Sequence, residues 1–224
     1  TQYYRGEQIL RGFDREARDL IASSMIERGI DLRCGVDVAR IEKTGPGLVV
    51  TDKMGNTASF DQVMYATGRA PNTAGLGLED VGVKTGAAGE ILVDKFSQTS
   101  LPSIYAIGDV TNRANLTPVA IREAMALVET VFKDNPVAPD HDLIPTAIFT
   151  QPEMGTVGLS EEDARAQEPI DVYASSFKPM HSGFAGNSEK MLMKLIVSQQ
   201  SGRVLGCHIV GPVAGEMIQL AGIA

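Results

Sequence analysis

The segment YAIGDVTNRANLTPVA, residues 105–120, joins an apolar run to the start of a helix and decides the fold of the chain. The run Ser103–Ile107 predicts a buried strand, which stops at Gly108-Asp109. Leu116-Thr117-Pro118 then opens a predicted helix that ends near Lys133, since proline suits the first turn of a helix. Ligands of open α/β sheets bind at the carboxyl ends of strands. The spacing allows either a plain strand–helix loop or a cofactor-binding turn.

A second predicted strand, Asp61–Ala66, also runs into a glycine, Gly68. Glycine at a strand end lets the backbone approach a ligand closely. Asp109 could accept charge-assisted hydrogen bonds from sugar or ribityl hydroxyls. The unpaired N–H groups and the positive dipole end of the following helix would favour the negative charge that a flavin ring gains on reduction. These features make a flavin the candidate ligand of the turn.

Two arginines, Arg5 and Arg11, flank the loop after the first predicted strand, which ends at Tyr4. In NAD-binding folds the corresponding strand usually ends in an acidic residue that holds ribose hydroxyls. Two guanidinium groups suit a 2′-phosphate instead, through charge and bidentate contact. The alternative is that they are surface arginines paired with Glu7 and Asp14.

Asp14 is a predicted N-cap for a helix over residues 15–28, which Gly29 ends. Arg15 and Arg18 lie beside acidic residues on this helix, and the pattern predicts a solvent-exposed face for both. Further along the chain, glycine, proline and asparagine punctuation predicts an antiparallel meander of three strands: Val36–Glu42, Gly47–Asp52 and Thr57–Phe60.

The region after residue 140 is predicted to be a separate α+β unit, with a helix at Ser160–Gln167 and a further helix in the last residues. Its predicted strands are Ala147–Phe149, Met154–Gly158, Asp171–Phe177, Met191–Val197 and Val204–Val210. Residues 73–102, which lie between the predicted strands at 61–66 and 103–107, are glycine-rich and irregular, with one short predicted strand at Ile91–Val93.

Composition narrows the function. The 224 residues are 43% hydrophobic and 21% charged, with a net charge of −8, so nonspecific nucleic-acid binding is not expected. No apolar run of about 18 residues predicts a membrane span. Cys34 and Cys207 form no redox or metal spacing and indicate reduced thiols in a cytoplasmic protein. The histidines at 141, 181 and 208 share no ligand spacing, so they are predicted to be structural or exposed, and no metal site is predicted.

Five segments together resemble the glutathione reductases, which are flavin-dependent pyridine nucleotide–disulfide oxidoreductases. They are RGEQILRGFD (5–14), YATGRAPNT (65–73), IYAIGDVTNRANLTPVAIREA (104–124), TAIFTQPEMGTVGLSEEDA (146–164) and VLGCHIVGPVAGEMIQLAGIA (204–224). The sequence LTPVA at 116–120 resembles the version found in glutathione and trypanothione reductases, whereas dihydrolipoamide dehydrogenases usually differ there. The resemblance favours a flavin-binding turn at 105–120 over a plain loop. It also favours a 2′-phosphate site at Arg5 and Arg11 over surface ion pairs.

The resemblance implies an α/β fold with partial doubly wound FAD- and NAD(P)-binding domains, followed by a partial α+β dimerisation domain. The expected modules are residues 1–72, the carboxy-terminal half of the NADPH domain; 73–142, the returning segment of the FAD domain; and 143–224, the truncated dimerisation domain. The implied cofactor-binding residues are Arg5 and Arg11 for the NADPH 2′-phosphate, Gly68 for the nicotinamide nucleotide, Gly108 and Asp109 for the FAD ribityl chain, Leu116, Thr117 and Pro118 for the flavin pyrimidine edge, and Ala147 near the nicotinamide.

The resemblance also implies the activity: NADPH-dependent reduction of glutathione disulfide through FAD and a redox-active disulfide, by a cytoplasmic homodimer. The redox cysteine pair, the FAD glycine motif and the His-Glu pair of the family are absent from these residues. We therefore expect an internal fragment that is inactive alone. Met125 stands where some glutathione reductases carry a substrate-binding arginine. Trypanothione reductase-like, dihydrolipoamide dehydrogenase-like and non-catalytic nucleotide-binding proteins are the alternatives.

Overall fold

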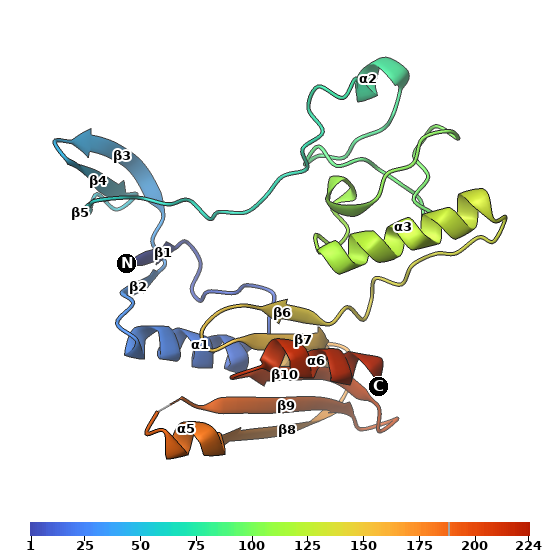
Figure 1. Ribbon diagram of the computed structural model, residues 1–224. Coiled ribbons are helices and arrows are strands. Elements are labelled where there is room, and N and C mark those ends of the chain that lie inside the picture. Colours follow the sequence, from blue (N-terminus) through green and yellow to red (C-terminus); the bar gives the residue numbers. More distant parts are fainter. Residues whose placement is uncertain (188) are drawn as a thin grey trace. The chain divides into compact units, whose positions relative to one another are not determined.

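The computed structural model describes residues 1–187 and 189–224, drawn in Figure 1. The chain forms two compact units. The first combines Thr1–Met64 with Leu143–Ala224, and the second is Tyr65–Asp142. Each unit has its own hydrophobic clusters and is described separately below.

An antiparallel five-stranded sheet in the order β6-β7-β10-β9-β8 is the centre of the first unit (Figure 1). Its strands are β6 (Thr146–Ile148), β7 (Met154–Gly158), β8 (Ile170–Phe177), β9 (Met191–Ser198) and β10 (Val204–Val210). These strands match the sequence predictions within two residues at each end. Short helices α4 (Glu161–Arg165) and α5 (Met180–Phe184) lie in the connections, and α5 was not predicted.

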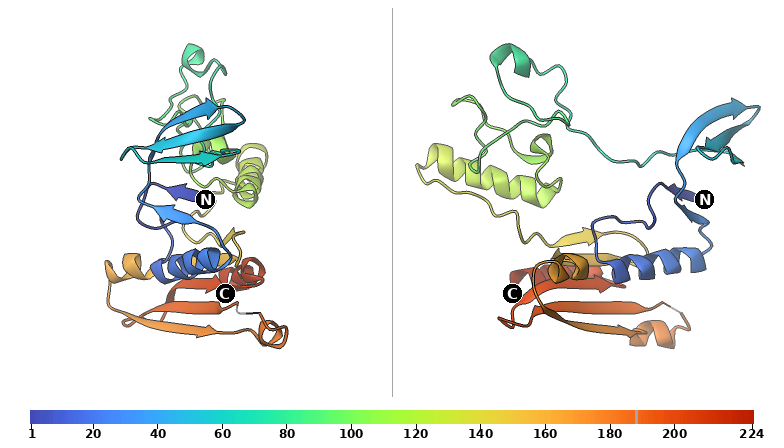
Figure 2. Two further views of the ribbon diagram at one scale, coloured as in Figure 1. Left: turned by 90° about the vertical axis from the view of Figure 1, so that its left-hand side faces the viewer. Right: turned by 180° about the vertical axis from the view of Figure 1, so that it is seen from behind.

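Two longer helices pack against this sheet: α1 (Arg15–Glu27) and α6 (Ala214–Ile223), which Figure 2 shows from two further sides. Because side chains alternate along a strand, the sheet buries different residues on its two faces. Met154, Leu192 and Val210 pack in a cluster with Ala17 and Ile21 of α1. The cluster on the α6 side consists of Met191, Cys207, Ile209, Ala214 and Ile218.

A glycine in β7 lets α6 approach the sheet closely. A Cβ atom on Gly155 would lie 2.4 Å from the Ala214 carbonyl oxygen and 2.7 Å from Ile218 Cβ. No other residue type fits there without displacing the helix. The sequence predicts both the strand and the terminal helix, but it does not show that their contact requires a glycine at position 155.

The first unit also contains two smaller sheets. Strands β1 (Gln2–Tyr4) and β2 (Leu32–Cys34) pair in parallel, with α1 as their crossover. Strands β3 (Val38–Thr44), β4 (Gly47–Asp52) and β5 (Thr57–Phe60) form the predicted antiparallel meander. The βαβ arrangement places the loop with Arg5 and Arg11 between the end of β1 and the start of α1.

The second unit has little regular structure apart from one long helix. It contains α2 (Leu78–Val81), the 3₁₀ turn η1 (Gly108–Thr111) and α3 (Thr117–Phe132), which starts and ends within one residue of the prediction. Val83, Ile91 and Ala106 form its small buried cluster, with partly buried side chains around them.

Three predicted strands do not form in this unit or at its border. Residues 61–66 are an extended segment in which Met64 and Tyr65 are 88% and 68% exposed, so the prediction of a buried strand is wrong here. The segments 91–93 and 103–107 contribute only isolated bridges, Thr85–Ile91 and Gln98–Tyr105. A strand needs a neighbour for its backbone groups, and these apolar runs find no ladder among the described residues.

None of the described helices combines the length and the apolar character needed to cross a membrane.

Candidate cofactor-binding sites

The loop between β1 and α1 presents two free guanidinium groups. Arg5 and Arg11 are exposed, and neither forms an ion pair within residues 1–187 and 189–224. The alternative in which Arg11 pairs with Asp14 does not occur, because that carboxylate is buried and bound to Lys194. Two unpaired guanidinium groups at one strand-end loop suit the charge and the hydrogen-bonding geometry of a phosphate.

Arg18 supports this loop, which corrects the prediction that it lies on a solvent-exposed face. Its Nε donates to the Ile9 carbonyl oxygen and its Nη2 donates to the Gln8 carbonyl oxygen, both at 2.7 Å. The side chain is only partly exposed. Arg15 does follow the prediction: it is exposed and pairs with Asp19 at 3.3 Å.

A buried ion cluster fixes the start of α1 to the sheet. Asp14 is fully buried, and its Oδ1 accepts hydrogen bonds from the backbone N–H groups of Glu16 and Ala17, which confirms the predicted N-cap. Lys194 of β9, 2% exposed, lies 3.0 Å from Asp14 Oδ2 and 2.7 Å from Glu161 Oε2. The Glu161 N–H donates to Asp14 Oδ2 at 3.1 Å. One lysine therefore connects α1, the start of α4 and the central sheet.

The cluster keeps all of its groups charged. Burial would raise the pKa of Asp14, but hydrogen bonds from Lys194 and from the Glu161 N–H hold it below the usual value. Burial would lower the pKa of Lys194, yet its bonds to Glu161 and Asp14 raise it above normal. The hydrogen bond from Lys194 also lowers the pKa of Glu161. At neutral pH the cluster is a buried cation among carboxylates.

His208 of β10 is a hydrogen-bonded core residue, as the sequence predicts. Its Nε2 lies 2.9 Å from the Leu159 carbonyl oxygen, which can only accept, so Nε2 carries the proton. Its Nδ1 then accepts from the Thr156 hydroxyl at 2.6 Å. Burial lowers the pKa of this imidazole, which is neutral and has both nitrogens bonded.

In the second unit, Gly108 and Asp109 form the turn that the sequence predicts to contact a flavin. Gly108 has φ +70°, which favours glycine, and a Cβ there would lie 3.1 Å from the Ala120 Cβ. Asp109 is exposed, and its carboxylate accepts no hydrogen bond from the described part of the chain. Its oxygens are free to accept hydroxyl donors from a ligand.

The start of α3 lies in the same unit. Its N-cap is Leu116, whose side chain makes no capping hydrogen bond, and Pro118 stands in the first turn. Thr117 and Pro118 are exposed. A helix start without a side-chain cap leaves N–H donors free for a ligand, so this chain's donor set fits an electronegative edge such as that of a flavin.

A buried carboxylate holds the Gly108 turn in place. Glu123 of α3 is 1% exposed, and its Oε2 accepts a hydrogen bond from the Gly108 N–H at 2.6 Å. Its Oε1 lies 2.9 Å from Arg113 Nη2 and 2.7 Å from His141 Nε2, which donates because a carboxylate only accepts. Arg113 also donates to the Ser97 hydroxyl at 3.0 Å. The turn is therefore attached to α3 through one side chain.

Replacing Glu123 with glutamine is expected to destabilise the second unit by about 1.5–3 kcal/mol, since hydrogen bonds to a charged group are lost. The glutamine carbonyl still accepts from the Gly108 N–H, but it cannot balance the Arg113 charge. Denaturant unfolding of the complete polypeptide encoded by the gene, with the wild type beside it, measures the change. Glu129→Gln alters an exposed pair on the same helix and should change stability little. Equal stability of wild type and Glu123→Gln would contradict the assignment.

The other two predicted site residues lie in different surroundings. Gly68 is exposed in the second unit with φ +117°, in open space, within an extended segment. Ala147 lies in β6 of the first unit, and its methyl group faces the start of α6 near Gly215. Their contacts with a nucleotide stay predictions.

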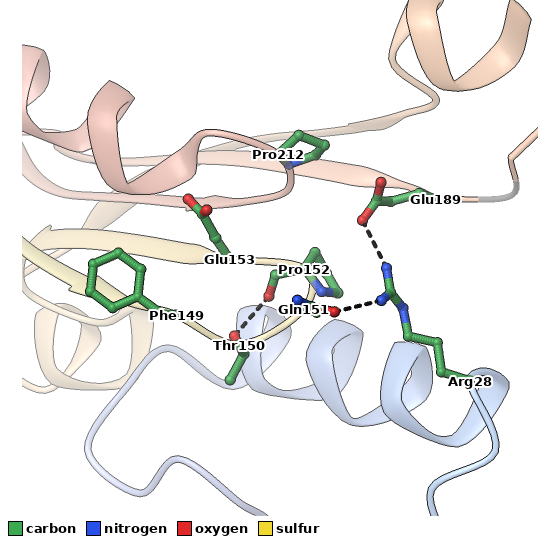
Figure 3. A pocket seen from close by; sticks show the side chains of 8 residues that line it. All are labelled: Arg28, Phe149, Thr150, Gln151, Pro152, Glu153, Glu189 and Pro212. Carbon is green, nitrogen blue, oxygen red and sulfur yellow. Dashed lines mark hydrogen bonds and ion pairs between the residues drawn. The ribbon is translucent and has the colours of Figure 1, made fainter. Parts of the chain in front are cut away.

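A surface pocket of about 310 Å³ lies in the first unit, at the end of α1 and the β6–β7 turn (Figure 3). Arg28 donates to the Gln151 side-chain oxygen at 3.1 Å and pairs with Glu189 at 3.3 Å across it. The lining residues are Arg28, Phe149, Thr150, Gln151, Pro152, Glu153, Glu189 and Pro212. None of these lining residues is a predicted cofactor residue, and the guanidinium of Arg28 is already paired with Glu189.

The fold is therefore mixed α/β, with an antiparallel five-stranded sheet in the last third of the chain. Residues 1–124 match the family described as pyridine nucleotide-disulphide oxidoreductase, and residues 144–224 match the dimerisation domain of the same family. The chain belongs to the pyridine nucleotide–disulphide oxidoreductases.

Curated relatives include glutathione and trypanothione reductases. The chain is 48% identical to glutathione reductase of Burkholderia cepacia, over 100% of this chain and 50% of the relative. It is 47% identical to the chloroplastic/mitochondrial glutathione reductase of Pisum sativum, over 97% of this chain and 40% of the relative. The chain is also 44% identical to trypanothione reductase of Leishmania donovani, over 98% of this chain and 45% of the relative. The chain thus spans about half the length of these proteins.

Among solved structures, the HOCl-induced flavoprotein disulfide reductase RclA of Escherichia coli shares the fold. Its TM-score is 0.89 at 24% sequence identity, over 99% of this chain and 51% of that one. This likeness agrees with the expected fold class of partial nucleotide-binding domains followed by a dimerisation domain. The exact boundaries of the three modules stay a prediction.

Proposed function

We propose that the chain is part of an NADPH-dependent flavoprotein disulfide reductase that reduces glutathione disulfide and maintains thiol redox balance. The observation that carries the proposal is the loop with two exposed arginines, Arg5 and Arg11, in a chain 48% identical to a glutathione reductase. A glutamate or aspartate at this strand end would favour NAD, but here Tyr4 precedes Arg5.

FAD and NADPH are the proposed cofactors, and this chain's residues would bind and orient them. Arg5 and Arg11 would hold the 2′-phosphate of NADPH, which distinguishes it from NADH. Asp109 would accept hydrogen bonds from ribityl hydroxyls, on the turn that Glu123 fixes. The free N–H groups at the start of α3 would face the flavin pyrimidine edge. The flavin supplies hydride and electron transfer between nucleotide and disulfide.

The proposed assembly is a homodimer formed through residues 144–224, which match the family's dimerisation domain. The cytoplasm is the proposed compartment, because Cys34 and Cys207 are both free thiols. Burial raises the pKa of the Cys207 thiol, so it is a poor thiolate nucleophile. The redox-active pair of the proposed reaction is therefore expected elsewhere in the complete polypeptide.

The test is steady-state oxidation of NADPH by the complete purified polypeptide, with glutathione disulfide, trypanothione disulfide and lipoamide as separate substrates. Turnover with glutathione disulfide at least tenfold faster than with the other two is the expected result. A preference for trypanothione disulfide would support the second candidate function, which the 44% identity to a trypanothione reductase favours. No turnover with any disulfide would contradict both.

A further inference from the structure

Only part of the loop that bears Arg5 and Arg11 is packed: Ile9 is buried in the cluster with α1 and Leu10 packs against that cluster, whereas both arginines are exposed. Of the residues from 5 to 12, only Ile9 is buried, and Gly12 has φ +92°. Leu10 has φ +56°, in the left-handed region that side chains rarely adopt. Such a backbone keeps one conformation only when neighbouring groups determine it.

Arg18 provides that support through a two-pronged contact. Its Nε and Nη2 each donate at 2.7 Å to consecutive carbonyl oxygens, those of Ile9 and Gln8. These two carbonyls directly precede the strained Leu10. A planar guanidinium fork can hold two adjacent acceptors in one fixed arrangement, which an ammonium group cannot reproduce.

A second contact ties the loop to the same helix. The Gln8 side-chain Nε2 donates to Asp19 Oδ1 at 2.6 Å, and its Oε1 accepts from the Ile9 N–H at 3.0 Å. The base of α1 is itself anchored to the sheet through Asp14 and Lys194. Arg18 therefore adds two side-chain hydrogen bonds between the loop and a helix that is anchored to the sheet.

We infer that Arg18 is a positioning residue that sets the preference of this site for a 2′-phosphorylated nucleotide. It does so without touching the ligand, by holding the carbonyls of Gln8 and Ile9 so that Arg5 and Arg11 are presented together. The inference rests on the proposed NADPH site. Ordering a mobile arginine on binding costs affinity, and a preformed loop avoids that cost. The preference should therefore fall when the clamp is removed, although both phosphate-binding arginines remain.

The experiment compares the dissociation constants of 2′,5′-ADP and 5′-AMP by calorimetry on the complete polypeptide. The ratio of the dissociation constant of 5′-AMP to that of 2′,5′-ADP isolates the contribution of the 2′-phosphate. Arg18→Met is expected to lower the ratio about tenfold, from the cost of ordering two free arginines, and Arg18→Lys should give an intermediate value. Arg28→Met removes the same charge from the C-terminal end of the same helix, where the side chain contacts Gln151 and Glu189 and not the loop, and should leave the ratio near that of the wild type.

The outcomes separate the inference from the proposed function. A wild-type ratio near one would contradict the NADPH site, and with it the role of Arg18. A strong wild-type preference that Arg18→Met retains would overturn the inference alone. General destabilisation would weaken both ligands equally and leave the ratio unchanged, which also counts against it. Should Arg18→Met fail to fold, Arg18→Lys decides: a reduced ratio supports the inference, and an unchanged ratio overturns it.

Discussion

Replacing Lys194 with methionine is expected to lower the free energy of unfolding by about 3–5 kcal/mol, because removing one partner of a buried ion pair leaves the other charge uncompensated. Asp14, fully buried, would lose its cation while still bonded to the N–H groups of α1. Methionine has nearly the length of lysine, so the cavity contribution stays small. Denaturant unfolding of the complete polypeptide, followed by circular dichroism, measures the loss.

Two further variants show whether the uncompensated charge causes the loss of stability in Lys194→Met. The double variant Asp14→Asn/Lys194→Met removes both charges and should be more stable than Lys194→Met alone, since no buried ion is left unpaired. Lys53→Met removes a lysine from an exposed pair with Asp37 and should have little effect. The ion-pair explanation would be contradicted if the double variant lost more unfolding free energy than the two single variants lose together.

The pH dependence of stability is an independent test of the pair between Asp14 and Lys194. The native pKa of Asp14 lies below its unfolded value, so the stability that this carboxyl contributes is complete above the unfolded pKa and is lost as pH falls through the native pKa. Without Lys194, burial raises the pKa of Asp14, and the carboxyl takes up a proton more readily. The difference in stability between wild type and Lys194→Met should therefore be largest at neutral pH and should shrink as the pH falls toward and then below the ordinary aspartate pKa of about 4.

Most of the regular structure follows from local patterns. The N-cap at Asp14, the meander and the strands Met154–Gly158 and Val204–Val210 lie where periodicity and turn residues predict them. Their signals are local because each is complete within one hairpin or one helix. The predicted strand at 61–66 failed because an apolar run alone does not determine whether another strand will pair with it.

The supporting residues of the candidate sites were harder to predict. Lys194 stands inside the apolar run MLMKLIV, which is a visible signal of a buried charge, but its partner Asp14 is 180 positions away. Glu123 and Arg18 look like ordinary charged positions of amphipathic helices. Their partners are backbone groups of a turn and a loop, and no sequence pattern reports backbone geometry at that distance.

Replacing both Arg5 and Arg11 with methionine is expected to lower kcat/KM for NADPH by about 10²–10⁴, if each arginine contributes the 1.5–3 kcal/mol typical of hydrogen bonds to charged groups. Catalysis with NADH should change little, because that nucleotide has no 2′-phosphate for them to bind. The measurement is the ratio of kcat/KM for the two nucleotides with glutathione disulfide as acceptor. Arg40→Met, in an exposed pair with Glu42 on β3, is the matched control for loss of charge.

The two single variants decide how the phosphate is held. If both arginines contact it, each single change should lower the ratio by about 10–10². The double variant should lower the ratio further than either single change. The preference should also weaken as salt is added, because both guanidinium groups are exposed to screening. An equal loss for NADPH and NADH would mean that the arginines support the loop rather than the phosphate, and the assignment of NADPH would then be wrong.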